Sequence, residues 1–168
     1  VVVVKFGGSA MEVPSHKESI LQDTAFMECV GMKSVIVHGG GKAISRGMRA
    51  KKVKSHFLHG LRVTDDEAIH VVHDVLTNEV NQSVIAILKA KGADAVQIKG
   101  EDIITAEKMV GEDEEGNVID WGFVGKPVSV DAEPVLEVLR RRQVPVITPL
   151  GKDADGNIYN INADIAAA

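Results

Sequence analysis

The chain has 168 residues, of which 45% are hydrophobic and 26% are charged, a composition typical of one globular domain. Lys and Arg number 19 against 24 Asp and Glu, and this net charge of −5 argues against a protein whose main task is to grip nucleic-acid phosphates. No apolar run approaches the ~18 residues of a membrane-spanning helix. Cys29 is the single cysteine, so no internal disulfide can form, which fits a reducing cytoplasm.

The first half of the chain alternates apolar runs with helical patterns, which predicts an α/β fold with a largely parallel sheet. Residues 1–6 read as a strand. A helix follows from Ser15, with Ser15 and Glu18 at capping-box spacing, a face formed by Leu21, Ala25 and Cys29 that we expect to be buried, and a C-cap at Gly31. A second strand covers 34–37, a helix starts near residue 42, and 57–64 form a loop or short hairpin.

The second half opens with the longest predicted helix, from a capping box at Thr64 and Glu67 to about Lys91. Strands are predicted at 95–98 and 144–148, an antiparallel ribbon over 103–130 with a turn at 114–117, and a helix from a cap at Asp131 to about Arg142. A hairpin turn at 153–157 leads into a strand over 158–161. One stripe of the long helix is expected in the core: Ile69, Val72, Leu76, Val80, Val84 and Leu88.

The two ends indicate a piece of a longer chain. Val1 already lies inside a predicted strand and no initiator Met precedes it, while 162–168 resemble the first turn of a helix.

Two glycine clusters, at 7–8 and 39–41, each follow a predicted strand and precede a helix. Tight turns need glycine anyway, so one such cluster would be weak evidence of function. Two clusters on neighbouring parallel strands would converge at one edge of the sheet, where backbone N–H groups can bind an anion. Neither matches a P-loop or a dinucleotide-binding motif, so we expect a phosphate cradle of another design.

Lys5 lies at the end of an apolar strand, directly before the first glycine cluster. A lysine in this place could simply extend its charge to solvent. The adjacent glycines favour a different role, in which the ammonium group neutralises a phosphoryl group during its transfer.

Polar residues at two further junctions are candidates for ligand binding. Arg62 precedes the long helix and could bind a carboxylate with two hydrogen bonds, or form an ordinary surface salt bridge. Asn160 and Asp164 lie at a strand-to-helix junction, where Asp164 could cap the helix or could orient lysines or a metal. The histidines show no metal-ligand spacing, and His38 is expected to shape the glycine turn beside it.

Four segments together carry a family resemblance: Val3–Ser9, Val37–Lys42, Gly60–Asp65 and Asn160–Asp164. In order and spacing they resemble the acetylglutamate kinases of the amino acid kinase family, over the whole of residues 1–168. The resemblance implies a three-layer αβα sandwich with a central, mostly parallel sheet. It also implies that the chain is the amino-terminal, acyl-acceptor-binding half of such an enzyme, without the carboxyl-terminal nucleotide-binding half.

The resemblance assigns roles to individual residues. Lys5 and Asp164 are implied to be catalytic, Lys5 against the transferring phosphoryl group and Asp164 orienting the catalytic lysines. Gly7, Gly8 and Gly39, with the Gly40 amide, would bind phosphate. Acceptor binding falls to a further set of residues: Gly40, Gly41, Arg62 and Asn160.

The implied reaction is the ATP-dependent phosphorylation of the side-chain carboxylate of N-acetyl-L-glutamate, a step of arginine synthesis. ATP is expected as the phosphoryl donor with Mg²⁺ accompanying it, and a cytoplasmic homodimer that meets through this half is expected as the assembly. No protein-bound metal, nucleic acid or membrane partner is expected. Two alternatives stay open: a kinase for a related acid such as aminoadipate, and a non-catalytic ligand-binding or regulatory module. Without the nucleotide half, the chain alone is expected not to turn over.

Overall fold

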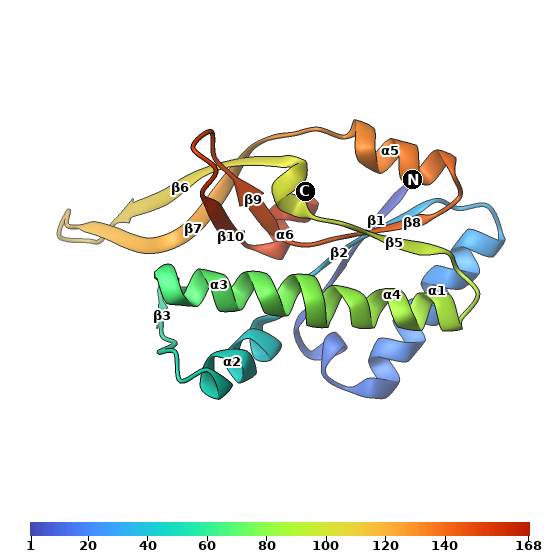
Figure 1. Cartoon of the computed structure of the whole chain (residues 1–168), viewed down its shortest axis with the longest axis horizontal. Helices are drawn as coiled ribbons and strands as arrows, with labels where there is room; N and C mark the ends of the chain where they lie inside the picture. The colour runs from blue at the N-terminus through green and yellow to red at the C-terminus, as the bar shows by residue number, and fades with distance from the viewer.

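A four-stranded parallel sheet forms the centre of the molecule (Figure 1). The computed structural model describes residues 1–168, leaving aside the side chain of Ser9. The strands lie in the order β1 (Val2–Phe6), β2 (Ser34–His38), β8 (Val144–Ile147) and β5 (Ala95–Ile98). Every residue of β2 and β8 is buried, as expected for a parallel sheet covered on both faces.

Helices cover both faces of this sheet (Figure 1). On one face, α1 (Pro14–Cys29) and α4 (Asn81–Ala90) pack in a core that includes Leu21, Leu88 and Val146. On the other face, α5 (Glu133–Arg140) and α6 (Ala163–Ala167) share a second core with Val37 and Ile147. The predicted three-layer αβα arrangement is therefore confirmed.

The remaining strands form a second group beside the sheet. The long hairpin of β6 (Ile104–Glu112) and β7 (Val118–Val130) projects from the body of the molecule (Figure 1). It closes a ring with β9 (Leu150–Lys152) and β10 (Ile158–Ile161). The hairpins predicted over 103–130 and around 153–157 are both confirmed, and so is a short one of β3 (Phe57–Leu58) and β4 (Leu61–Arg62).

One helical rod runs from residue 66 to residue 90 (Figure 1). It consists of α3 (Asp66–Asp74), a π-helical segment (Val75–Val80) and α4. All six residues of the predicted core stripe are buried, which confirms the longest helix and its inward face. The short helix α2 (Gly41–Ala50) packs against this rod beside the π-helical segment.

The starts of two helices differ from the predictions. Helix α1 begins at Pro14 and has Val13 as its N-cap, and the Val13 side chain has no acceptor, so the proposed capping box at Ser15 is wrong. Helix α3 is capped by Asp65, whose Oδ1 accepts from the Ala68 amide at 2.8 Å. Thr64 does not cap it, because its buried hydroxyl donates to the Arg62 carbonyl at 3.0 Å.

The predicted burial of Cys29 is also wrong, because this side chain is exposed. Leu21 and Ala25 are buried as expected. Each step of four residues rotates a helical position by about 40°, so Cys29 points about 80° away from Leu21 and leaves the core. Among the helices that the structure describes, none is long and apolar enough to cross a membrane.

Candidate functional site

The two glycine turns meet at the carboxyl edge of the parallel sheet, as predicted. Phe6 is in register with His38, so the turns that follow β1 and β2 begin side by side. The Gly39 amide donates to the Phe6 carbonyl at 2.7 Å. A Cβ on Gly7 would lie 3.6 Å from the Gly39 Cα, so the two backbones approach closely.

The glycine amides differ in their availability to a ligand. The Gly39 N–H is already used by the Phe6 carbonyl, so it is not free to bind a phosphate oxygen directly. The amides of Gly7, Gly40 and Gly41 have no acceptor in the part of the chain that the structure describes. Gly41 opens helix α2, where the first N–H groups point away from the helix and favour an anion.

Lys5 reaches over the first glycine turn and pairs with Asp164. Its Nζ lies 2.9 Å from Asp164 Oδ1, and its terminal atoms lie 3.3 and 3.4 Å from where a Cβ on Gly7 would be. The N-cap of α6 is Asn162, whose Oδ1 accepts from the Asp164 amide at 2.8 Å. The Asp164 carboxylate is therefore not used as the helix cap and is available to orient Lys5.

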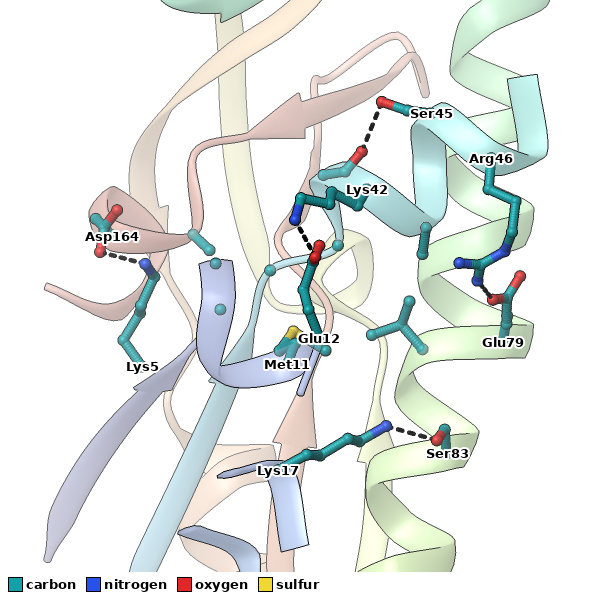
Figure 2. Close-up of a pocket in the computed structure, with 18 of the residues that line it drawn as sticks. Lys5, Met11, Glu12, Lys17, Lys42, Ser45, Arg46, Glu79, Ser83 and Asp164 are labelled. Atoms are coloured by element: carbon teal, nitrogen blue, oxygen red, sulfur yellow. Dashed lines mark hydrogen bonds and ion pairs between the residues drawn. The ribbon is translucent and has the colours of Figure 1, made fainter. Parts of the chain in front are cut away.

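A cleft of about 980 Å³ opens between the glycine turns, the start of α1, α2 and the long helical rod (Figure 2). Five cations line it against three carboxylates, so the cleft is positive although the whole chain is negative. Such a surface attracts anionic ligands. The charged lining residues are Lys5, Lys17, Lys42, Arg46, Arg49, Glu12, Glu79 and Asp164.

Sequence reasoning missed most of these cations. Lys42 pairs with Glu12 and Arg46 pairs with Glu79, and all four residues line the cleft (Figure 2). Lys17 is half-buried and donates to the Ser83 hydroxyl at 2.6 Å, and burial lowers the pKa of its ammonium group. These cations lie on two helices, α1 and α2, so only the tertiary structure brings them together.

Arg62 is buried directly behind the second glycine turn. Its guanidinium donates to the Gly41 carbonyl at 2.9 Å and to the Ser45 hydroxyl at 2.8 Å, and it also donates to the Ser55 hydroxyl. It stacks 4.6 Å from the Phe57 ring centre. No described carboxylate pairs with it, and burial lowers its pKa, so the surface salt bridge considered above is wrong.

Asn160 does not line the cleft that the glycine turns border. It is half-buried in β10, paired with Val124 of β7 and Leu150 of β9. Within the described residues, no three His, Cys, Asp or Glu side chains gather as metal ligands.

Comparison with known proteins identifies the family of the chain. The model of the amino acid kinase family matches residues 1–168. The acetylglutamate kinase of Halothermothrix orenii is 40% identical over 167 residues, which cover 98% of this chain and 57% of that protein. The chain thus spans little more than half the length of such relatives.

Two solved structures show the same architecture. The smu.665 protein of Streptococcus mutans superposes with a TM-score of 0.83 at 30% identity, over 98% of this chain and 64% of that one. N-acetylglutamate synthase from Neisseria gonorrhoeae, at 22% identity, shares the fold with a TM-score of 0.79 over 99% of this chain and 37% of its own. Because the family model matches all of residues 1–168, the chain belongs to the amino acid kinase family.

Proposed function

We propose that the chain is the acceptor-binding part of an ATP-dependent kinase that phosphorylates the side-chain carboxylate of N-acetyl-L-glutamate. The observation that carries the proposal is Lys5, held by Asp164 over two converging glycine turns in a positive cleft. The 40% identity to an acetylglutamate kinase supports the choice of acceptor.

The proposed chemistry asks for charge neutralisation and positioning more than for proton transfer. A carboxylate nucleophile is already deprotonated at neutral pH, so no general base is needed to activate it. One carboxylate oxygen forms a bond to the terminal phosphorus of ATP, the bond from that phosphorus to the bridging oxygen breaks, and ADP leaves. Lys5 and the free amides of Gly7 and Gly40 would stabilise the charge on the phosphoryl oxygens, and Gly8 completes that turn.

The acceptor would lie along the start of α2. We assign its acetylated amino acid part to Gly40 and Gly41, and its α-carboxylate to Arg62. Asn160, which the family resemblance also implied, does not line the cleft and is left out of this assignment. Arg62 is a buried cation with no carboxylate partner among the described residues, and it contacts the cleft residues Gly41 and Phe57 without lining the cleft itself. Its hydrogen bonds to the Ser45 and Ser55 hydroxyls would give way to the α-carboxylate.

The nucleotide would be held chiefly by residues outside this sequence. The chain spans 57% of the length of the relative from H. orenii, which leaves room there for a second half. The free glycine amides and Lys5 suit only the terminal phosphate of ATP, with Mg²⁺ carried by the nucleotide phosphates. We include in the proposal a homodimer that meets through this half, which analytical ultracentrifugation would detect.

Calorimetry with N-acetyl-L-glutamate tests the proposal. The expected result is binding that is at least tenfold tighter than that of glutamate, aspartate or aminoadipate. Arg62→Lys should weaken it more than tenfold, because lysine keeps the charge and loses the guanidinium fork. The matched control is Arg46→Lys, an exposed cleft cation, which should change the affinity less than twofold.

The other outcomes identify the alternatives. A preference for aminoadipate would reassign the acceptor and keep the kinase. In a second experiment the chain is joined to a nucleotide-binding half, and any acyl phosphate it forms is trapped with hydroxylamine. If the acceptor binds but no acyl phosphate forms, the non-catalytic module is favoured. Binding of none of the four acids would contradict the proposed acceptor site.

A further inference from the structure

A buried polar chain runs beneath the second glycine turn. His38 and Asn81 are both fully buried, on β2 and at the start of α4. His38 Nδ1 lies 2.9 Å from the Gly39 carbonyl oxygen, and His38 Nε2 lies 3.0 Å from Asn81 Nδ2. Asn81 Nδ2 lies 2.9 Å from the Val146 carbonyl oxygen in β8. This series of hydrogen bonds thus links the middle of the sheet to the turn.

The chemistry of these groups fixes the position of every proton in this series of hydrogen bonds. The Val146 carbonyl can only accept, so the amide nitrogen of Asn81, and not its oxygen, must face it. The second amide proton of Asn81 then points to His38 Nε2, which must accept and therefore carries no proton. The proton of neutral His38 is left on Nδ1, where it donates to the Gly39 carbonyl.

Protonation of His38 would break this arrangement, because Nε2–H would face the amide donor of Asn81. Burial is the main cause that lowers the pKa of His38 to about 4, and the positive charge of Lys17 lowers it further, against the effect of the Gly39 hydrogen bond. Lys17, on α1, is the charged group that acts on His38. The neutral form is therefore the one present near pH 7.

Asn81 also has an unpaired atom that stability does not explain. Its Oδ1 is buried without a hydrogen-bond partner among the described residues. An unsatisfied buried acceptor destabilises the folded state, and a leucine of similar size would avoid that cost. An amide is useful at this position because its nitrogen supplies two donors, one for the Val146 carbonyl and one for His38 Nε2.

The helix around Asn81 is shaped to reach the turn. The π-helical segment ends at Val80, directly before Asn81. It presents Leu76 and Val80 to the turn, where a Cβ on Gly40 would lie 2.6 Å from Leu76 Cδ2 and 3.5 Å from Val80 Cγ2. π-Helical turns of this kind occur often at functional sites.

We propose that Asn81 is a positioning residue for the glycine turn: held by the Val146 carbonyl, it keeps His38 in the neutral Nδ1–H form, whose proton fixes the Gly39 carbonyl. The amides of Gly40 and Gly41 are thereby directed into the cleft. The consequence for binding rests on the proposed function of this turn as an anion cradle, whereas the arrangement of His38 does not.

The first test needs no ligand. In ¹⁵N NMR spectra of the whole chain at pH 7, His38 should be neutral with its proton on Nδ1. Asn81→Leu should shift the amide signals of Gly40 and Gly41 and mix the two tautomers. The matched control is Thr77→Val, which removes another buried, unpaired side-chain atom of the same helical rod. A proton on Nε2 in the wild type, or equal shifts in both variants, would overturn the proposal.

The second test measures affinity for N-acetyl-L-glutamate by calorimetry between pH 5 and 8. We expect a pH-independent Kd in the wild type and in Thr77→Val, and a loss of at least tenfold in Asn81→Leu. Asn81→Asp should make the Kd pH-dependent, because a carboxylate beside Nε2 favours protonated His38. A merely structural role would produce no such pH dependence, and a flat profile in Asn81→Asp would contradict positioning.

The two tests fail in distinguishable ways. If the wild type binds no N-acetyl-L-glutamate, the proposed acceptor is wrong, and the NMR result alone decides the role of Asn81. If Asn81→Leu does not fold, Asn81→Ser takes its place, because serine can satisfy only one of the two acceptors and should give the same direction of change.

Discussion

Replacing Gly40 by alanine tests the packing of the glycine turn on the long helical rod. The φ of Gly40 is −176°, outside the left-handed region that favours glycine, so the effect of alanine is read from the space around its Cβ. The new Cβ would lie 2.6 Å from Leu76 Cδ2, well inside van der Waals contact. Leu76 is 1% exposed, so its methyl group has little room to move.

The size of the effect follows from this contact. Overpacking of a filled core costs about 1–3 kcal/mol. For a chain of this length, each kcal/mol lowers Tm by about 2–4 °C, so Gly40→Ala should lower Tm by roughly 2–12 °C. The displaced turn should also weaken acceptor binding.

Gly41→Ala is the matched control, one residue along the chain. A Cβ there would meet nothing within 4 Å, at the first position of α2. Alanine in place of glycine in a compatible conformation is expected to be neutral or to stabilise by up to about 1 kcal/mol. Thermal and urea unfolding of both variants make the comparison. Equal stability of Gly40→Ala and Gly41→Ala would refute the packing argument.

Three further predictions follow from the structure. Because burial lowers the pKa of His38 below its value in the unfolded chain, the unfolded state gains the proton first as pH falls, and stability is lost between pH 6.5 and 4. Urea unfolding should show that the free energy of unfolding falls by about 2 kcal/mol from pH 7.5 to 5. This loss should be unchanged in His16→Gln and absent in a folded His38→Gln variant. In a form of the protein that turns over, Lys5→Met should lower kcat by a factor of about 10²–10³ with little change in the KM for the acceptor. The control Lys152→Met, outside the cleft, should leave both kcat and KM unchanged. Equal effects of the two substitutions would contradict the role of Lys5. Gly100→Ala should destabilise by more than about 3 kcal/mol in the same unfolding assay, because its Cβ would lie 2.1 and 2.3 Å from two backbone carbonyl oxygens, and a variant of normal Tm would show this geometry to be wrong.

The sequence predicted the features that depend on local pattern. Alternating apolar runs and helical periods gave the parallel sheet and its layers, since each period fixes which side of an element faces the core. The glycine turns converge because both follow neighbouring parallel strands, which chain order alone suggested. Lys5 was found because a lysine in an apolar strand is unusual.

The features that were missed depend on tertiary contacts. His38 and Asn81 are 43 residues apart, and no local pattern connects them. The cleft cations Lys17 and Arg46 look like ordinary polar positions of two separate helices until those helices pack together. Thr64 matched the spacing of a capping box, but it is buried and its backbone pairs with Gly122 in a β-bridge. A tertiary contact that the local motif does not reveal therefore decides its role.

The most direct test of the central claim is an NMR titration of the chain with N-acetyl-L-glutamate, which reads the amide signals of individual glycines. We predict that the signals of Gly40 and Gly41 move with a saturable dependence on ligand concentration, and that glutamate produces little change at equal concentration. The signal of Gly116, in the turn of the projecting hairpin, should stay in place. Unmoved signals of Gly40 and Gly41 at saturating N-acetyl-L-glutamate would contradict the account.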